Sequence, residues 1–216
     1  MSPHNAPPLT NSQTSAPLRS GLLPGFAEPV IEAQRVFRAV LEGMSFPGRV
    51  VPLPLDLIAP EPLNATAAAV LLALADLDSP IWLDPVYDLP PVREFLAFHC
   101  GAPRVGRDRA AFAVVTAADD LDGLALGTAA SPERAATAIL PVPALSQPCA
   151  GEGVRLVLRG PGILDTTRLT VPGLSPALIA GLRRNEALFP QGIDLVLAAP
   201  RQIACLPRTT RLTVED

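Results

Sequence analysis

The sequence predicts a layered α/β domain with a mixed β-sheet. Helical patterns and short apolar segments rich in Val, Leu and Ile interleave along the chain without a strict β-α-β alternation. Hydrophobic residues make up 49% of the 216 positions, which is enough to build a core. We expect residues 1–22, which are polar and rich in Pro and Ser, to be a flexible tail. Residues 23–216 are then expected to form a single domain.

The first half of this domain is expected to be mainly helical. The predicted elements are a helix that ends at Ser45, an edge strand over Val50–Leu55, a helix from Asn64 to Ala75, a strand over Ile81–Leu83 and a helix over Pro91–Cys100. The first helix ends there because Phe46 precedes a proline and is therefore disfavoured in the helical region. Pro52 and Pro54 cannot donate to a β-ladder, so their strand is placed at an edge or in an extended loop. Asn64 is a good N-cap, and Gly101 can end the third helix in the left-handed conformation.

The second half is expected to supply most of the sheet. The predicted strands are Ala111–Val115, Thr137–Leu140, Val154–Leu158, Ile193–Leu197 and Gln202–Leu206. A fourth helix begins at Ser175-Pro176, with proline in the first helical position, and runs to about Asn185. The last two strands are close enough in sequence to form a hairpin through Ala199-Pro200-Arg201.

Charge and residue usage exclude several classes of function. All 17 basic side chains are arginine, so a lysine Schiff base, a phosphate-loop lysine and a kinase-type lysine are excluded. The formal net charge is −4, which argues against a nucleic-acid partner. The one basic cluster, Arg104, Arg107 and Arg109, lacks interleaved aromatics and is interpreted as a solvated loop.

Cysteine usage and hydropathy give no sign of a metal site or a membrane segment. Cys100, Cys149 and Cys205 are far apart and form no C-x-x-C pair, so no zinc or iron–sulfur site is expected. Reduced thiols in a cytoplasmic protein are the simplest interpretation. The longest apolar run, residues 65–75, is too short to span a bilayer, which takes about 20 residues. The N-terminus lacks the charged and apolar regions of a signal peptide.

His99 is the only histidine of the expected domain, because His4 lies in the tail. It lies on the apolar face of its predicted helix, near the C-terminal end, where an imidazole commonly hydrogen-bonds to backbone carbonyls. The alternative is a ligand or interface contact. A catalytic pair with Cys100 is disfavoured because adjacent helical residues point about 100° apart. No catalytic residue and no cofactor are therefore expected.

Other polar groups favour structural roles over chemistry. Asp76 and Asp78 are interpreted as turn residues, with a carboxylate pair as the alternative. Gly160-Pro161-Gly162 is interpreted as a tight turn, because Asp165 stands where a dinucleotide motif needs its third glycine. Asp119, Asp120 and Asp122 lack metal-ligand spacing and are interpreted as a solvated loop.

Anion binding is the one chemical function that the sequence suggests. Arg208, Thr209 and Thr210 follow an apolar strand, and an arginine beside two hydroxyls can grip a phosphate or phosphonate. Arg38 and the pair Gly127-Thr128 are further candidates. The alternative for these residues is a structural role, with the arginine holding a neighbouring carboxylate.

Seven motifs occur in order along the chain. They are Phe37-Arg38-x-x-Leu41-x-x-Met44-Ser45-x-Pro47-Gly48, Leu71 to Leu83, Phe98-His99-x-Gly101-Ala102-Pro103, Gly127-Thr128 with Pro132-Glu133, Leu158-x-Gly160-Pro161-Gly162-Ile163, Phe189-Pro190-x-Gly192-Ile193-Asp194-Leu195, and Leu206-Pro207-Arg208-Thr209-Thr210. Together they resemble the PhnH family, the H subunit of the bacterial carbon–phosphorus lyase core complex. The resemblance runs from about Gly25 to Val214. The long tail before Leu22 and the tract from Ala144 to Gly153 depart from the family pattern.

The resemblance implies a fold similar to pyridoxal-phosphate-dependent transferases, a three-layer α/β/α sandwich without the cofactor. It also implies a non-catalytic structural subunit that assembles with the G, I and J subunits and is a homodimer in isolation. That complex makes alpha-D-ribose 1-alkylphosphonate 5-triphosphate from ATP and an alkylphosphonate, before a radical step cleaves the carbon–phosphorus bond. An anion-binding module is the alternative function. Trp82, His99 and Phe189 are interface candidates, with core packing as the alternative for Trp82.

Overall fold

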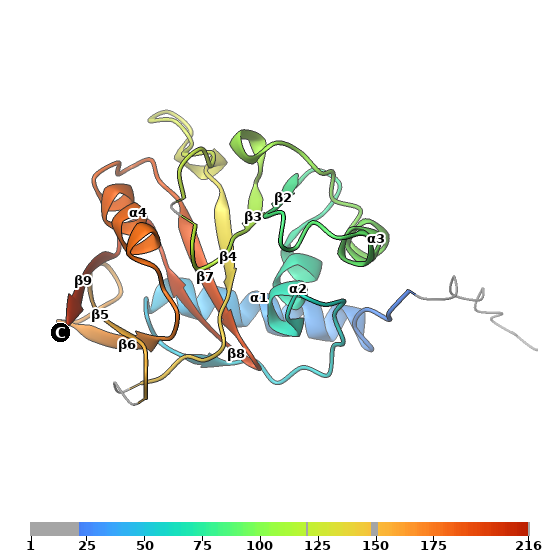
Figure 1. Ribbon diagram of the computed structural model, residues 1–216, viewed down its shortest axis with the longest axis horizontal. Coiled ribbons are helices and arrows are strands. Elements are labelled where there is room, and N and C mark those ends of the chain that lie inside the picture. Colours follow the sequence, from blue (N-terminus) through green and yellow to red (C-terminus); the bar gives the residue numbers. More distant parts are fainter. Residues whose placement is uncertain (1–21, 120, 148–150, 216) are drawn as a thin grey trace, which may run out of the picture.

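The computed structural model describes residues 22–119, 121–147 and 151–215 (Figure 1). The expected tail, apart from Leu22, lies outside the described residues, as do Asp120 and Cys149. The described residues form α1 (Pro29–Ser45), β1 (Val51–Pro52), α2 (Ala65–Leu74), β2 (Ile81–Leu83), α3 (Pro90–His99), β3 (Phe112–Val114), β4 (Thr137–Pro141), β5 (Val154–Arg159), β6 (Thr167–Val171), α4 (Pro176–Glu186), β7 (Asp194–Ala199), β8 (Gln202–Leu206) and β9 (Arg211–Glu215). Two short 3-10 helices, Arg107–Arg109 and Pro132–Arg134, precede β3 and β4, respectively.

A mixed six-stranded sheet forms the centre of the fold, as the sequence predicts. Its strand order is β1-β8-β7-β4-β3-β2. Strands β7, β4, β3 and β2 are parallel neighbours, whereas β8 is antiparallel to β7 and β1 is antiparallel to β8. The predicted edge position of the proline-containing strand is confirmed, since β1 lies at one edge and pairs with β8 alone. The mixed α/β class is therefore confirmed.

Both faces of this sheet are buried. Ile139 of β4 and Val196 of β7 face the side covered by α1, α2 and α3, where they join one apolar cluster. Their neighbours in sequence, Leu140 and Leu197, face the opposite side and join a second cluster with Leu182 of α4. Side chains alternate between the faces of a strand, so strands that are covered on both sides are apolar at nearly every position.

The second covering layer combines a helix with a small sheet. Strands β6, β5 and β9 form a separate antiparallel sheet in that order, and they gather with α4 at one end of the molecule (Figure 1). Strand β5 agrees with the sequence prediction, whereas β6 and β9 were not predicted, because their Arg and Thr residues leave them without an apolar run. The two outer layers are therefore unlike each other, one helical and one mixed. Similarity to pyridoxal-phosphate-dependent transferases stays a prediction.

The predicted ends of several elements are confirmed. The Asn64 side chain accepts a hydrogen bond from Ala67 N at 2.7 Å, and Ser175 caps α4 through Leu178 N at 3.0 Å. Gly101 ends α3 with φ +65°, in the left-handed region. The β7–β8 hairpin turns at Pro200-Arg201, as expected. In the described part of the chain, no helix has the length and apolar character needed to cross a membrane.

Candidate functional site

Arg208, the strongest anion-binding candidate, is held in an ion pair. Its Nη2 lies 2.6 Å from Asp194 Oδ2, and its Nε and backbone N donate to Asp194 Oδ1 at 3.2 and 2.8 Å. Its Nη1 donates to the carbonyl of Pro132 at 2.5 Å. The two side chains are only 15% and 22% exposed. The geometry matches the alternative kept open by the sequence, an arginine that holds a neighbouring carboxylate.

The two neighbouring hydroxyls belong to a turn and differ in burial. The backbone N of Thr210 donates to the carbonyl of Pro207 at 2.8 Å, which closes the turn. Thr210 is buried, and its Oγ1 has no hydrogen-bond partner among the described residues. Thr209 is half-buried and lines a surface pocket. The three residues of the motif therefore have different surroundings, and joint anion binding by them stays a prediction.

Gly127 and Thr128 lie close to Arg208 and take part in a backbone turn. Gly127 has φ +71°, and a Cβ there would lie 2.9 Å from the carbonyl of Pro132, the group that Arg208 contacts. The Thr128 hydroxyl accepts a hydrogen bond from the backbone of Ser131 at 3.0 Å. Arg38 is exposed on α1. The buried side of this helix packs against the face of the central sheet opposite to the one that α4 covers. The six candidates are thus divided between at least two places.

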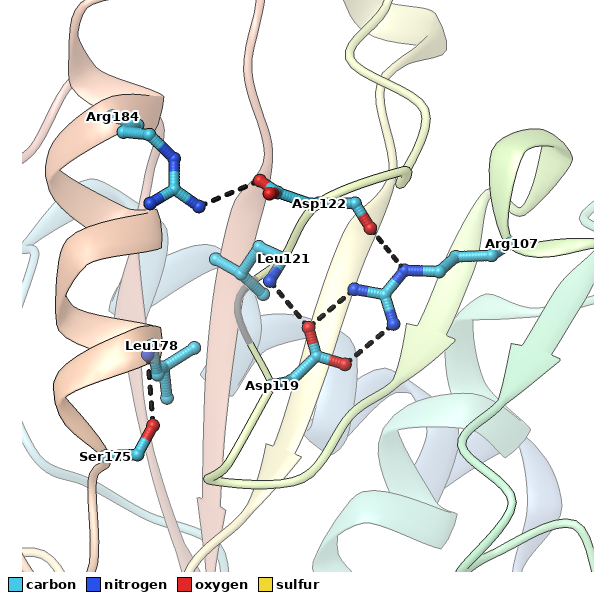
Figure 2. Close-up of polar contacts among 7 residues, drawn as sticks. All are labelled: Arg107, Asp119, Leu121, Asp122, Ser175, Leu178 and Arg184. Atoms are coloured by element: carbon cyan, nitrogen blue, oxygen red, sulfur yellow. Dashed lines mark hydrogen bonds and ion pairs between the residues drawn. The ribbon is translucent and has the colours of Figure 1, made fainter.

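An ion-pair network connects the loop after β3 with α4 (Figure 2). The two Nη atoms of Arg107 donate to the two carboxylate oxygens of Asp119 at 2.7 and 2.5 Å, and its Nε donates to the carbonyl of Asp122 at 2.7 Å. The carboxylate of Asp122 in turn lies 2.8 Å from Arg184 of α4. The interpretation of these arginines and aspartates as solvated loops was wrong for Arg107 and Asp119. The Asp119 side chain is only 4% exposed, and the fold places the guanidinium of Arg107 beside it.

The interface candidates are at three separate positions. Trp82 lies on β2, the edge strand of the central sheet, and is half-buried with the guanidinium of Arg107 over its ring at 4.7 Å. His99 is half-buried, and its Nε2 lies 3.0 Å from the carbonyl of Leu23. Phe189 is 63% exposed after the end of α4. The predicted backbone contact of His99 is therefore present, and the interface roles stay predictions.

The remaining polar motifs form turns. Asp76 Oδ1 accepts hydrogen bonds from the backbone of Asp78 at 3.0 Å and from the hydroxyl of Ser79 at 2.7 Å. These bonds lower the pKa of Asp76, led by the bond from Ser79. The glycine-proline-glycine segment closes through a hydrogen bond from Ile163 N to Gly160 O at 3.1 Å. Both turn interpretations are confirmed.

The described cysteines are poor nucleophiles. Burial, and secondarily the charge of Asp194, raises the pKa of Cys205 to about 12. Burial also raises the pKa of Cys100, whose thiol donates to Leu96 O at 3.1 Å and not to the adjacent His99. A thiol whose pKa is raised stays protonated near neutral pH, and the thiolate is the reactive form. No cluster of three His, Cys, Asp or Glu side chains suited to a metal ion occurs within residues 22–119, 121–147 and 151–215.

Asn185 is a buried polar residue that was not singled out from the sequence. Asn185 of α4 accepts a hydrogen bond from Ile193 N at 2.6 Å and donates to Ile193 O at 2.9 Å. A Cβ at Gly192 would lie 2.7 Å from its Oδ1, so glycine is required beside it. The asparagine holds the segment that leads into β7. Its only sequence signal was a polar residue on the apolar face of α4.

These contacts define a class of protein. Across the described residues, most of the polar side chains considered as functional candidates hydrogen-bond to backbone groups or pair with opposite charges. This arrangement is that of an α/β scaffold. The chain belongs to the PhnH family: residues 24–213 match the model described as "Bacterial phosphonate metabolism protein (PhnH)".

Two curated relatives agree with this family. The "Alpha-D-ribose 1-methylphosphonate 5-triphosphate synthase subunit PhnH" of Rhizobium meliloti (strain 1021) is 38% identical over 194 residues, which cover 88% of this chain and 94% of the relative. The "Putative C-P lyase subunit protein HtxG" of Stutzerimonas stutzeri is 32% identical over 187 residues, which cover 84% and 86% of the two chains.

Proposed function

We propose that this protein is a non-catalytic structural subunit of the carbon–phosphorus lyase core complex in phosphonate catabolism. It would act in the cytoplasm as a homodimer that assembles with the G, I and J subunits. The complex would make alpha-D-ribose 1-alkylphosphonate 5-triphosphate. Two relatives that cover most of the chain are named as subunits, and the name of one specifies a ribose 1-methylphosphonate 5-triphosphate synthase.

The observation that carries the proposal is an apolar stripe on the outer side of α1. Val30, Phe37 and Leu41 are 83%, 52% and 56% exposed, and their spacing of seven and four residues places them on one side of the helix. Val36 and Val40, each about 100° round the helix from its neighbour Phe37 or Leu41, are buried against the sheet. Exposed apolar patches of this kind mark interaction surfaces.

A second apolar feature lies just after the end of α1. Phe46 lines a groove of about 400 Å³ together with Ile163 and Leu164 of the β5–β6 loop. The Leu164 side chain is fully exposed at the surface. Arg38 stands beside the stripe and can form part of a polar rim. We assign this stripe, together with the groove at Phe46, to a partner subunit of the complex.

Co-expression with the G, I and J subunits tests the assembly. The four chains should elute together in gel filtration as one stable species. Separate elution of this chain at every concentration would contradict the proposal. Gel filtration of the chain alone, with light scattering, checks the homodimer, because a homodimer has twice the 22.6 kDa mass of the monomer.

Point variants test the surface itself. Phe37→Glu combined with Leu41→Glu should abolish co-elution, because a carboxylate in an apolar interface would lose its hydration. Val86→Glu is the matched control, since Val86 is also 55% exposed but lies in the loop after β2. Circular dichroism and thermal melting establish that each variant is folded. Equal loss of co-elution in the control would refute the assignment of α1 as the docking surface.

A further inference from the structure

A pocket of about 350 Å³ opens where the end of β5, the end of α4 and the beginning of β9 meet. Its lining residues are Arg159, Gly160, Pro161, Glu186, Phe189, Thr209 and Arg211. The volume falls in the range of small-molecule sites, about 300–1,000 Å³. The pocket lies apart from the apolar stripe of α1 and shares no lining residue with the groove at Phe46.

Two arginines meet at this pocket. Arg159 of β5 and Arg211 of β9 are directly opposite each other in the antiparallel register. Like charges in such positions repel, unless a negative group lies between or beside them. Glu186 compensates one of them, because its Oε1 lies 3.3 Å from Arg211 Nε. Arg159 forms none of the ion pairs found among the described residues and is exposed. The pocket thus has a surplus positive charge in a chain whose net charge is −4.

The rest of the lining supplies a hydroxyl and an aromatic ring. Thr209 is positioned by a turn that Arg208 anchors on Asp194. The turn is in close contact with β5, since a Cβ at Gly160 would lie 2.8 Å from Thr209 O. Phe189 is 63% exposed and lines the same pocket. A guanidinium, a hydroxyl and an exposed ring in one concavity suit an anion that has an apolar part.

We propose that this pocket binds a small organic oxyanion, such as an aryl phosphate. Arg159 and Thr209 would hold the oxyanion, and the ring of Phe189 would cover the apolar part. Glu186 keeps Arg211 in position, so Arg159 is the guanidinium that remains for a ligand. The ion pair of Arg208 with Asp194 acts as a support for the turn and makes no contact with the ligand. The inference is independent of the proposed function, because it concerns the isolated chain.

Calorimetry with the full chain tests this site, with phenyl phosphate as the probe and inorganic phosphate and phenol as its separate halves. We expect phenyl phosphate to bind about tenfold more tightly than either half, because both parts of the pocket are then occupied. Arg159→Gln should weaken binding of phenyl phosphate about tenfold or more, by loss of a charge-assisted contact. Phe189→Ala should reduce the affinity for phenyl phosphate to that for inorganic phosphate.

Arg155→Gln is the matched control, because Arg155 is an exposed arginine on the same strand outside the pocket. It should leave the affinity unchanged. Absence of saturable binding at millimolar phenyl phosphate by the folded chain would overturn the proposal. An equal effect of the two arginine variants would also overturn it, since binding would then reflect general charge attraction. Both results leave the assembly with partner subunits unaffected, so the two proposals can fail separately.

Discussion

Arg107 and Asp119 form a two-pronged ion pair in which each Nη atom of the guanidinium donates to a different carboxylate oxygen. Their side chains are 23% and 4% exposed, although Arg107 begins the short 3-10 helix before β3 and Asp119 lies in the loop after it. The same carboxylate accepts a hydrogen bond from Leu121 N at 2.6 Å, and Leu121 has a left-handed backbone with φ +66°. The pair therefore fixes the course of the loop that approaches α4 (Figure 2).

Asp119→Asn is expected to lower the free energy of unfolding by about 3 kcal/mol, because it removes the buried carboxylate charge that both Nη atoms of Arg107 contact. Chemical denaturation followed by circular dichroism measures the change. The control is Asp56→Asn, since Asp56 pairs with Arg201 but its side chain is 97% exposed. This control should barely alter stability. Similar losses in the two variants would contradict the structural role of the Arg107 pair.

The Arg208–Asp194 pair is expected to contribute to stability as a unit. Alanine at either position should destabilise the protein, and the double variant should lose less than the sum, with a coupling of about 1–3 kcal/mol. Arg208→Lys should restore little, because lysine lacks the planar fork that contacts both Asp194 and the Pro132 carbonyl. Urea denaturation of the four proteins of the cycle gives the coupling.

The exposed pair Arg168–Glu215 provides a comparison for that cycle. Its side chains are 52% and 41% exposed, with a separation of 3.4 Å. Surface pairs of this kind contribute little because water and salt screen them. A coupling as large as that of the Arg208 pair would show that burial does not distinguish them.

Asn64 is expected to be more important than an ordinary helix cap. Besides capping α2, its side-chain nitrogen donates to Ala198 O of β7 at 2.8 Å, so it also ties the helix to the sheet. Asn64→Ala should lower the free energy of unfolding by about 2 kcal/mol, combining a lost cap with a lost hydrogen bond. Ser175→Ala removes a cap alone and should cost about 1 kcal/mol. Equal thermal shifts for the two would refute the second role of Asn64.

Cys205 is expected to resist alkylation in the native protein. Its pKa of about 12 keeps the thiol protonated at pH 8, and the side chain is fully buried beside Gly43. Iodoacetamide treatment followed by peptide mass spectrometry should leave Cys205 unmodified until urea unfolds the chain. Cys100 should react slowly, because it is partly exposed while burial raises its pKa. Modification of Cys205 at equal rates with and without urea would contradict the buried position.

The candidate site shows where sequence reasoning reached its limit. The motif at Arg208 was correctly singled out, and the alternative of a held carboxylate was stated, but Asp194 could not be named as the partner. The two residues are 14 positions apart, and the β7–β8 hairpin, which the sequence predicted, brings them together once its register is known. Arg159 and Arg211 were not proposed, because their opposition depends on a small sheet whose strands β6 and β9 lack an apolar run.

The sequence by itself determined the local structure and the family. Capping residues, prolines and glycines act within a few positions, so they determine where α1, α2 and α3 end and where the hairpin turns. The ordered motifs indicated the PhnH family, which the match over residues 24–213 establishes. Tertiary structure alone decided which charges are buried and which remain at the surface. Burial of a charge depends on contacts between distant segments. Whether an arginine such as Arg107 is paired or exposed is decided only by the groups that the fold places beside it.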